Sequence, residues 1–364
     1  MQVIVSRKDL SEAIALVSST VSPRSTAPIL TNLLLTAKGD KLIITGTDLE
    51  AWMQVETPAA IKSAGSITLP SRRLGEIVVA LPEADISIAT EGTKARITCV
   101  RADFSLLGMD ADDYPELPTF TVEQKLTLPR DILLSLVDKT LFSVSDEEKR
   151  YALNGILTQV EGTELRMVST DGYRLSFAKA TLAEPASSNI DLIVPAKAAR
   201  ELQKILVGEG TVAVELGSMH ISFAADGRLL VSRLLEGRFP PYKDVIPSAY
   251  EKRAVLNRRN FMDVVRRVSL LTDDKMRQLF FEFSAGTLKV KAQNAGLGEA
   301  EEQMDIAWEG EPLEISFNSD FVQSILKSLD GDELAMEMTT HLKPALFKPT
   351  ATDSHLCILT PMRL

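Results

Sequence analysis

The chain repeats one sequence pattern three times at a spacing of 123 residues, and this period constrains the fold more than any other feature. In each copy a glycine-containing turn leads into a short apolar run, and an Asp or Asn follows six residues after the first Leu of that run. A unit of this length can bury its own hydrophobic core. The 364-residue chain is therefore expected to contain three domains, marked by the pairs Leu42/Asp48, Leu165/Asp171 and Leu288/Asn294.

The same order of elements is expected in each of three domains, 1–122, 123–250 and 251–364. Apolar residues recur at helical spacing before each hairpin and again after it, whereas other segments alternate between apolar and polar residues. The pattern predicts an α+β fold in which each domain has two helices packed on antiparallel sheet. The expected helices are 6–19, 70–81, 129–142, 195–206, 257–271 and 318–329, and clear strand segments are 85–100, 211–225 and 333–340.

Local signals mark where several of these helices begin. Ser6 and Asp9 are typical of an N-cap pair. Asn318 or Ser319 is expected to cap the last helix, because short polar side chains accept hydrogen bonds from the free N–H groups of the first turn. Pro195 suits the first turn of the fourth helix, where its missing N–H would have no partner.

Charge is distributed unevenly between the helices and the rest of the chain. The net charge is −10, but the six helical segments together carry +6 and the remainder carries −16. Such a protein can present a relatively basic face to a polyanion and repel it elsewhere. The alternative is an ordinary acidic surface with basic side chains on solvated helix faces.

The sequence contains no constellation typical of an enzyme or a metal site. Cys99 and Cys357 are too few and too far apart for a disulfide framework or a CxxC site. The three histidines have no partner at metal-ligand spacing, and the common nucleotide-binding and hydrolase motifs are absent. The acidic run Asp110–Asp113 lacks the glycine of an EF-hand and is interpreted as a solvated loop. No catalytic residue, metal or cofactor is predicted.

Three observations favour a cytoplasmic protein. The N-terminal segment Met1–Leu10 has no signal-peptide pattern, and no apolar run approaches the roughly 20 residues needed to cross a bilayer. The low cysteine content fits a reducing compartment.

Four stretches, taken in order, carry a family resemblance. They are "APILTNLLL" with "TGTDLE", "RYALNGIL" with "STDGYRL", "EGRFPPY", and the terminal "TPMRL". Together they resemble the beta subunit of bacterial DNA polymerase III, the sliding clamp family. Each stretch alone is a weak signal, but the ordered set extends over the whole triplicated chain.

The resemblance implies a processivity factor that catalyses no reaction. Two crescent-shaped subunits would join head to tail into a homodimeric ring of clamp domains, with helices lining the hole and sheets outside. Double-stranded DNA would pass through the hole without sequence preference. The implied partners are the replicative polymerase alpha subunit, the clamp loader delta subunit, and other polymerases and repair proteins that carry clamp-binding peptides. The implied location is the cytoplasm, at the nucleoid.

The resemblance also implies a pocket for a short partner peptide with a glutamine and apolar anchors. Met362 suits adaptable apolar contacts, and Arg174 would either hold the shape of the pocket or reach a peptide carbonyl. Tyr173 stands where the family often has His, and Asp244 where some members are basic. The implied pocket residues are Leu153, Thr170, Gly172, Tyr173, Arg174, Leu175, Pro240, Val245, Ile358, Thr360, Pro361, Met362 and Arg363.

DNA contacts are implied at a second set of positions. Glu147 and Ala152 stand where some family members have Gln and an aromatic residue. Lys197, with Arg200 and Lys204, is a candidate on charge alone. The implied DNA-contacting residues are Arg24, Arg72, Glu147, Tyr151, Ala152 and Lys197.

A third set of positions is implied at the joint between subunits. Apolar pairs from the first and third domains would meet there, and basic residues of the first domain would face an acidic run of the third. The implied interface residues are Phe104, Leu106, Leu270, Leu271, Arg73, Arg101, Glu299, Glu301 and Glu302.

Two other classes of protein stay open from the residues alone. An adaptor built on the same repeats would bind peptides as a monomer and would not be retained on circular duplex DNA. A carboxylate-dependent hydrolase would use Asp110–Asp113, and an Asp112→Asn variant would lose its nuclease or phosphatase activity.

Overall fold

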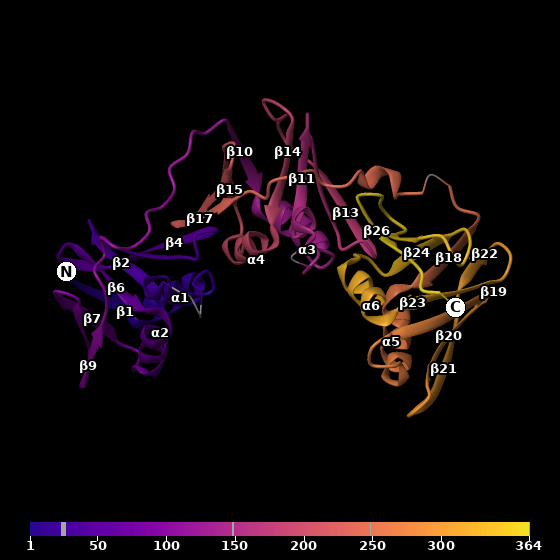
Figure 1. Ribbon diagram of the computed structural model, residues 1–364, viewed down its shortest axis with the longest axis horizontal. Coiled ribbons are helices and arrows are strands. Elements are labelled where there is room, and N and C mark those ends of the chain that lie inside the picture. Colours follow the sequence, from indigo (N-terminus) through magenta and orange to yellow (C-terminus); the bar gives the residue numbers. More distant parts are fainter. Residues whose placement is uncertain (23–26, 148, 248, 364) are drawn as a thin grey trace. The chain divides into compact units, whose positions relative to one another are not determined.

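The structure is a computed structural model that describes residues 1–22, 27–147, 149–247 and 249–363. Within these residues helices and antiparallel strands follow the predicted order (Figure 1). All six expected helices are confirmed, although the end of the expected helix 257–271 forms the 3-10 turn η4 (Ser269–Leu271). The helices are α1 (Arg7–Ser18), α2 (Ser71–Ala80), α3 (Arg130–Leu141), α4 (Ala196–Ile205), α5 (Arg258–Val268) and α6 (Ser319–Ser328).

Cap geometry explains where these helices begin. The Ser6 hydroxyl accepts a hydrogen bond from the backbone N–H of Asp9 at 3.1 Å, as predicted. The Asn318 side chain caps α6 through the N–H groups of Asp320 and Phe321, so Asn318 and not Ser319 is the cap. The placement of Pro195 in the first turn of α4 is wrong, because β14 continues through Pro195 and runs directly into the helix.

The chain divides into two compact units that share the second repeat between them. The first unit comprises Met1–Leu134 and Lys197–Leu234, and the second comprises Ser135–Ala196 and Leu235–Leu364. The division follows the sheets, because one group of strands from the second repeat joins a sheet of the first repeat and the other group joins a sheet of the third.

The first unit contains two antiparallel sheets. One has the order β5 (Ala60–Ser63), β1 (Gln2–Ser6), β7 (Asp85–Glu91), β8 (Lys94–Cys99) and β9 (Ala102–Leu107). The other has the order β10 (Gln124–Pro129), β15 (Thr211–Leu216), β16 (His220–Ala225), β17 (Arg228–Arg233), β4 (Ala51–Pro58), β3 (Lys41–Thr47), β2 (Asn32–Lys38) and β6 (Gly65–Pro70).

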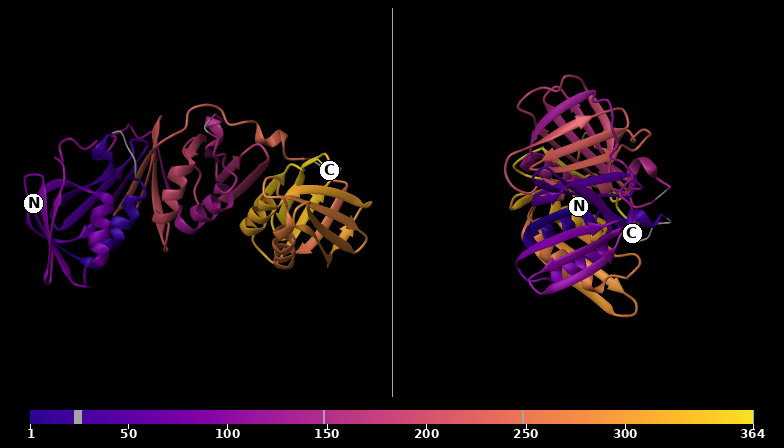
Figure 2. Two further views of the ribbon diagram at one scale, coloured as in Figure 1. Left: turned by 60° about the horizontal axis from the view of Figure 1, so that its bottom comes forward. Right: turned by 90° about the vertical axis from the view of Figure 1, so that its left-hand side faces the viewer.

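The second unit also contains two antiparallel sheets. The larger has the order β14 (Ile190–Pro195), β11 (Gly155–Glu161), β12 (Glu164–Thr170), β13 (Arg174–Thr181), β26 (His355–Leu359), β25 (Ala345–Pro349), β24 (Glu333–Met338), β18 (Lys252–Asn257) and β22 (Ala307–Glu309). The smaller has the order β21 (Gly298–Asp305), β20 (Thr287–Asn294), β19 (Gln278–Ser284) and β23 (Leu313–Asn318). In the left view of Figure 2, α5 and α6 lie side by side against these strands.

Two strand ladders cross the boundaries between repeats. We call the pairing of β17 with β4 the first inter-repeat ladder, and the pairing of β13 with β26 the second. Both are antiparallel and both lie inside a continuous sheet (Figure 1). Within the chain, a sheet therefore continues from one repeat into the next at both boundaries.

The helices bury the apolar faces that their periodicity predicts. Leu10, Ile14 and Val17 of α1 are buried, as are Phe261 and Val265 of α5. The core of the third repeat is the most aromatic, since Phe261, Phe281, Phe317 and Phe347 contact one another through ring pairs with centroids about 6 Å apart. These ring contacts join α5 to strands of both sheets of the second unit.

Candidate functional site

The turn between β12 and β13 has a shape set by its own polar side chains. Asp171 Oδ1 accepts hydrogen bonds from the backbone N–H groups of Tyr173 and Arg174, both at 2.9 Å. The Thr170 hydroxyl accepts from the N–H of Gly172 at 3.0 Å and donates to the Arg174 carbonyl at 2.7 Å. Gly172 has φ +88°, a conformation that favours glycine. Side-chain-to-backbone hydrogen bonds therefore fix the conformation of the turn Thr-Asp-Gly-Tyr-Arg, which exposes Tyr173 to solvent.

Arg174 is held by this turn, by α6 and by Phe142, which follows α3. Its Nε donates to Asp171 Oδ2 at 3.0 Å, and its Nη1 donates to the Ser324 hydroxyl. Its guanidinium carbon lies 4.4 Å from the ring centroid of Phe321 and 5.3 Å from that of Phe142. Only 14% of the side chain is exposed. These contacts favour the expectation that Arg174 holds the shape of the site.

Tyr173 covers this cluster from the solvent side. Its ring stacks on Phe321 at 6.3 Å between centroids, and the Arg150 guanidinium lies 5.9 Å from its centroid. Arg150 also donates to the Asp171 carbonyl at 2.8 Å. Tyr173 is nevertheless 53% exposed. It offers an aromatic surface that is fixed in orientation, as suits recognition of an apolar side chain.

The sequence did not indicate four residues of this cluster, which are Phe142, Arg150, Phe321 and Ser324. Phe321 and Ser324 are three residues apart on α6, so they share one helix face. That spacing was visible in the sequence. The sequence did not show that they would contact Arg174 of β13, because Arg174 and Ser324 are 150 positions apart.

An apolar cluster lies beneath the same surface. The predicted residues Leu175 and Ile358 are buried in it and face each other across the second inter-repeat ladder. Around them the chain between Pro240 and Val245 forms the 3-10 turn η3 (Tyr242–Asp244), which buries the Tyr242 ring. Pro240 and Val245 themselves are exposed. The other buried members of the cluster are Leu157, Val168, Ile193 and Leu346.

The C-terminal residues are tied to the same unit by backbone hydrogen bonds. The N–H of Thr360 donates to the Tyr173 carbonyl at 2.9 Å, and the N–H of Met362 donates to the Ser316 carbonyl at 2.8 Å. Gln278 donates to the Arg363 carbonyl at 2.8 Å. Pro361 and Met362 are half-buried. The structure thus brings the turn of Tyr173 and the segment 360–363 together, as the family resemblance implies.

Leu153 is the predicted pocket residue that lies in a short turn next to the apolar cluster. It ends the 3-10 turn η2 (Tyr151–Leu153), where its N–H donates to the Arg150 carbonyl at 2.7 Å and its carbonyl accepts from the N–H of Ser145 at 3.0 Å. The side chain is half-buried. Leu153 is therefore placed by the backbone of its own turn.

Arg72 and Lys197, the two described cations among the residues expected to contact DNA, are each paired with an acid. Arg72 and Arg73 on α2 both donate to Glu76, although the Arg72 side chain is 85% exposed. Lys197 on α4 donates to Asp48 and to the Thr20 carbonyl. These contacts lower the net positive charge that the helices present, in line with weak, sequence-independent attraction to phosphates.

The remaining expected DNA contacts lie near η2. Glu147 forms an ion pair with Arg150 at 3.1 Å, and Tyr151 is exposed. Ala152 packs partly against the apolar cluster under Tyr173. Arg24 lies outside the described residues.

The residues expected at a subunit joint lie on two separate strands and their neighbours. Phe104 on β9 is 38% exposed, and Leu270 in η4 is 77% exposed, whereas Leu271 packs against the core of the third repeat. Arg101 and Glu299 are exposed. Leu106 on β9 is half-buried.

Two acidic residues of β21, Glu301 and Glu302, already have basic partners in the same chain. Glu302 pairs with Arg267 at 2.5 Å, and this hydrogen bond lowers the pKa of the Glu302 carboxyl. Glu301 pairs with Lys289 at 3.1 Å, which lowers the pKa of Glu301 in the same way. Ion pairs with Arg73 or Arg101 of a second copy would have to share or replace these contacts.

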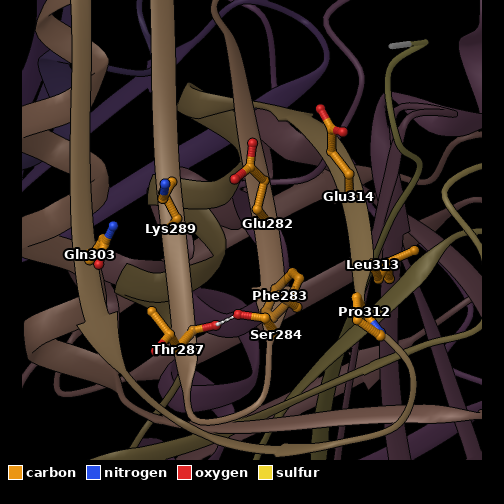
Figure 3. A pocket seen from close by; sticks show the side chains of 9 residues that line it. All are labelled: Glu282, Phe283, Ser284, Thr287, Lys289, Gln303, Pro312, Leu313 and Glu314. Carbon is orange, nitrogen blue, oxygen red and sulfur yellow. Dashed lines mark hydrogen bonds between the residues drawn. The ribbon is translucent and has the colours of Figure 1, made fainter.

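A shallow pocket of about 520 Å³ lies over the outer face of the smaller sheet of the second unit (Figure 3). Side chains from four neighbouring strands line it, and none of them is among the predicted site residues. The lining is mixed in charge, so it resembles a solvated sheet face. The lining residues are Glu282, Phe283, Ser284, Thr287, Lys289, Gln303, Pro312, Leu313 and Glu314.

Neither a metal centre nor a membrane span is found in the described part of the chain. No group of three or more His, Cys, Asp or Glu side chains there could hold a metal ion. No helix there is long and apolar enough to cross a membrane. In the acidic run 110–113, the Asp110 side chain accepts the N–H of Asp112 at 3.1 Å and closes an exposed turn, as the solvated-loop interpretation predicts.

Comparison with known proteins identifies three matching domain families in order. The N-terminal, central and C-terminal domain models of the DNA polymerase III beta subunit match residues 1–118, 127–241 and 243–363. Similar curated proteins include the beta sliding clamps of Vibrio cholerae, 32% identical, and Escherichia coli K12, 33% identical, each over 100% of both chains.

Solved structures of sliding clamps are similar to this chain over its whole length. A sliding clamp from Bartonella birtlesii is 32% identical with a TM-score of 0.96, and the alignment covers 100% of both chains. The DNA polymerase sliding clamp from Bacillus subtilis is 30% identical with a TM-score of 0.95, covering 100% of this chain and 99% of that one.

Proposed function

The chain belongs to the family of DNA polymerase III beta subunits, the sliding clamps, and from this premise we propose that two copies close head to tail into a ring around duplex DNA. The family acts as a processivity factor of DNA polymerase and is not catalytic. Its members work with DNA and polymerase as partners and as dimers. We place the domain boundaries at 122/123 and 250/251, and the site of action in the cytoplasm at the nucleoid.

The observation that carries the ring proposal is a pair of unfinished sheet edges. Among the described residues, β9 forms a strand ladder only with β8, and β21 only with β20. An exposed strand edge invites pairing with another chain. Because β9 lies in the first repeat and β21 in the third, pairing one with the other is heterologous, and two such contacts close a dimer.

Side chains beside these edges support the same contact. Phe104, Leu106 and Leu270 are exposed or half-buried apolar residues, and Leu271 packs against the core of the third repeat. Arg101 directly precedes β9 and Arg73 lies on α2, whereas Glu299, Glu301 and Glu302 lie on β21. Opposite charges at the rim of such an interface mainly set orientation, and contribute about 0–1 kcal/mol per pair.

We place the partner-peptide site on the surface formed by the turn of Tyr173, the segment 360–363 and the chain from Pro240 to Val245. A peptide from the polymerase alpha subunit, the clamp loader delta subunit, or another polymerase or repair protein would lay apolar anchors against Tyr173, Val245 and Met362. Arg174 would act behind them by fixing the Tyr173 turn. The remaining members of this proposed site are Leu153, Thr170, Gly172, Leu175, Ile358, Thr360, Pro361 and Arg363.

We assign DNA contact to cations and polar groups on the helices and near η2. Of the two described cations in this set, Arg72 has the more exposed side chain. Lys197 could reach phosphate only by leaving Asp48. Tyr151, Glu147, Ala152 and Arg24 complete the proposed set. Glu147 would weaken attraction to phosphate unless its pairing with Arg150 persists.

The test of the ring is light scattering behind a sizing column, with dilution from micromolar to nanomolar protein. The monomer is 39.9 kDa, so a closed dimer holds near twice that mass. Retention on nicked circular DNA, with release after the circle is cut, would then show that the ring encircles the duplex. A monomer at all concentrations, still able to bind peptide, would support the adaptor alternative instead.

The test of the peptide site is deletion of Met362–Leu364. Fluorescence anisotropy of a labelled clamp-binding peptide is expected to show loss of binding in the truncated protein. The deletion of Ala351–Asp353 from the turn between β25 and β26 serves as a length-matched control. Unchanged binding by the truncated protein would remove the assignment of this surface.

A further inference from the structure

The two inter-repeat ladders have one and the same register. Each consists of five residue pairs, running from Arg228↔Val55 to Ser232↔Ala51 in the first and from His355↔Ala178 to Leu359↔Arg174 in the second. Shifting β4 by 123 positions and β17 by 127 positions converts every pair of the first ladder into a pair of the second. The repeat therefore preserves the way in which one copy of the fold meets the next.

The backbone hydrogen bonds that close the ladders obey the same shifts. At one end an N–H donates to a turn carbonyl at 2.8 Å in both ladders, and at the other end an N–H donates across the ladder at 2.9 Å in both. The four bonds are Glu56 to Gly227, Lys179 to Ser354, Arg233 to Glu50 and Thr360 to Tyr173.

Strand β9 is the third member of the series that contains β17 and β26. Each of the three strands leads to a residue that bridges the edge of a neighbouring strand: Met109 to β6, Leu235 to β14 and Met362 to β23. The bridging residue follows the first residue of its strand by seven positions in all three. Ala102 therefore corresponds to Arg228 and His355.

Strand β21 is the third member of the series that contains β4 and β13. The hairpins that precede β4 and β13 close on the pairs Thr47↔Trp52 and Thr170↔Leu175. The corresponding pair in the third repeat is Gln293↔Glu299, so that turn is one residue longer. Glu299 therefore corresponds to Trp52 and Leu175.

We propose that β21 of one copy pairs with β9 of a second copy in the register of the two inter-repeat ladders, which places Ala300 opposite Phe104. This inference rests on the proposed ring and adds the residue-level pairing of its joint. The closing hydrogen bonds would run from the N–H of Leu107 to the Leu297 carbonyl and from the N–H of Gln303 to the Arg101 carbonyl. The expected pairs are Gly298↔Leu106, Glu299↔Ser105, Ala300↔Phe104, Glu301↔Asp103 and Glu302↔Ala102.

The register accounts for the apolar residues at these edges. The positions of Ala300 and Phe104 are occupied by Met53 and Leu230 in the first ladder, and both of those side chains are fully buried. Phe104 is exposed in the single chain, and the small Ala300 beside it leaves room for its ring. Leu297 and Leu107, which are also exposed, come together at one end of the pairing.

The register also brings two acids face to face. Asp103 would lie opposite Glu301, and like charges in that position destabilise a sheet. Each acid is held from behind by a cation on the neighbouring strand, Asp103 by Arg96 at 2.5 Å and Glu301 by Lys289 at 3.1 Å. Figure 3 shows Lys289 on β20, between Gln303 and Glu282. The joint would therefore contain a row of charges in the order plus, minus, minus, plus.

Disulfide crosslinking tests the register directly. The hydrogen-bonded pairs at the ends of the ladders make Met53↔Leu230 a non-hydrogen-bonded pair, so Ala300 and Phe104 would be about 4.5 Å apart at Cα, within reach of a disulfide. The test variant carries Phe104→Cys with Ala300→Cys. The matched control carries Phe104→Cys with Glu302→Cys, which is a slip of two residues on the same strand face. The native Cys99 and Cys357 are buried in both.

The outcomes separate the register from the ring. Mild oxidation is expected to give a covalent dimer in the test variant and little in the control. Preferential crosslinking of the control would overturn the register while leaving the ring in place. A wild-type protein that is monomeric in light scattering would overturn the ring itself, and with it this inference.

A second measurement avoids cysteines altogether. Asp103→Asn removes one of the two facing acids and leaves Arg96 free to attract Glu301, so the dimer dissociation constant at low salt is expected to fall about two- to five-fold. Asp40→Asn, an exposed acid of the β2–β3 turn, is the control and should change nothing. An unchanged or weaker dimer in Asp103→Asn would contradict the facing arrangement.

Discussion

The first and second inter-repeat ladders share a backbone arrangement but differ in the side chains placed over it. At the first ladder, the position of Leu175 is taken by Trp52, which is buried, and the Tyr114 ring is buried nearby, with its hydroxyl donating to the Asn32 carbonyl at 3.2 Å. At the second ladder, Tyr173 and Val245 remain about half exposed. The same scaffold is thus filled by its own aromatic residues in one place and left open in the other.

The polar contacts beside the two ladders also differ, and they too leave the first ladder covered and the second exposed. Asp48 and Asp171 are equivalent and both accept backbone N–H groups of their turns. Asp48 then binds Lys197 of α4, whereas Asp171 binds Arg174 of its own turn, which in turn stacks on Phe321 of α6. The first arrangement closes the surface, and the second supports an exposed Tyr173. One fold can therefore repeat a joint without repeating a binding site.

The largest effect is expected from Trp52→Ala at the first ladder. Removing a buried indole should lower the free energy of unfolding by about 3–5 kcal/mol, measured by urea denaturation. Peptide affinity at the second ladder should stay within two-fold of wild type. A comparable loss of peptide binding in the folded variant would show that the two ladders are not independent.

Arg174→Ala should affect both stability and peptide binding at the second ladder. It removes a nearly buried ion pair with Asp171 and the stacking on Phe321, for an expected loss of about 3 kcal/mol in the free energy of unfolding. Peptide affinity should fall at least ten-fold in anisotropy titrations. Lys179→Ala, on the same strand β13, is the control. Intact peptide affinity in a folded Arg174→Ala protein would contradict a supporting role for Arg174.

A pH dependence should distinguish the ladders, because only the second contains a buried histidine. Burial, with a further contribution from nearby Lys139, lowers the pKa of His355 from 6.5 to about 4, and Asp330 opposes this only in part. Its Nε2 lies 3.2 Å from the Ser176 hydroxyl and 3.5 Å from Cys357 Sγ. The folded protein therefore holds the neutral ring.

The sign of this effect follows from the lowered pKa. The unfolded chain binds the proton first, so stability falls as the pH drops from about 6.5 toward 4, by about 3 kcal/mol in all. Urea denaturation at a series of pH values would measure it. In His355→Gln the slope over this window should be reduced, and an unchanged slope would assign the effect to other groups.

The smallest effect is expected from Tyr114→Phe at the first ladder. The variant keeps the buried ring and loses only the hydroxyl, so stability should fall by about 1 kcal/mol. Burial raises the pKa of Tyr114 to about 12, so this hydrogen bond should persist through neutral pH. Stability equal to wild type in urea denaturation would show that the hydroxyl contributes nothing net to the closed surface.

The sequence alone determined the features that depend on local order along the chain. The period of 123 residues, the six helices, the cap at Ser6, a cap at Asn318 or Ser319 and the alternating strands were all predictable. Each rests on side chains a few positions apart, whose spacing reports directly on helix or strand geometry. The resemblance then placed Tyr173 and the segment 360–363 in one expected site.

Only the tertiary structure decided which of these elements meet. Nothing in the spacing shows that β17 pairs with β4, that Lys197 is held by Asp48, or that Arg174 lies on Phe321. The extra residue in the turn before β21 is equally hidden, yet it shifts the expected pairing with β9 by one position. Such contacts join residues far apart in sequence, and their register is set by which faces become buried when the sheets assemble.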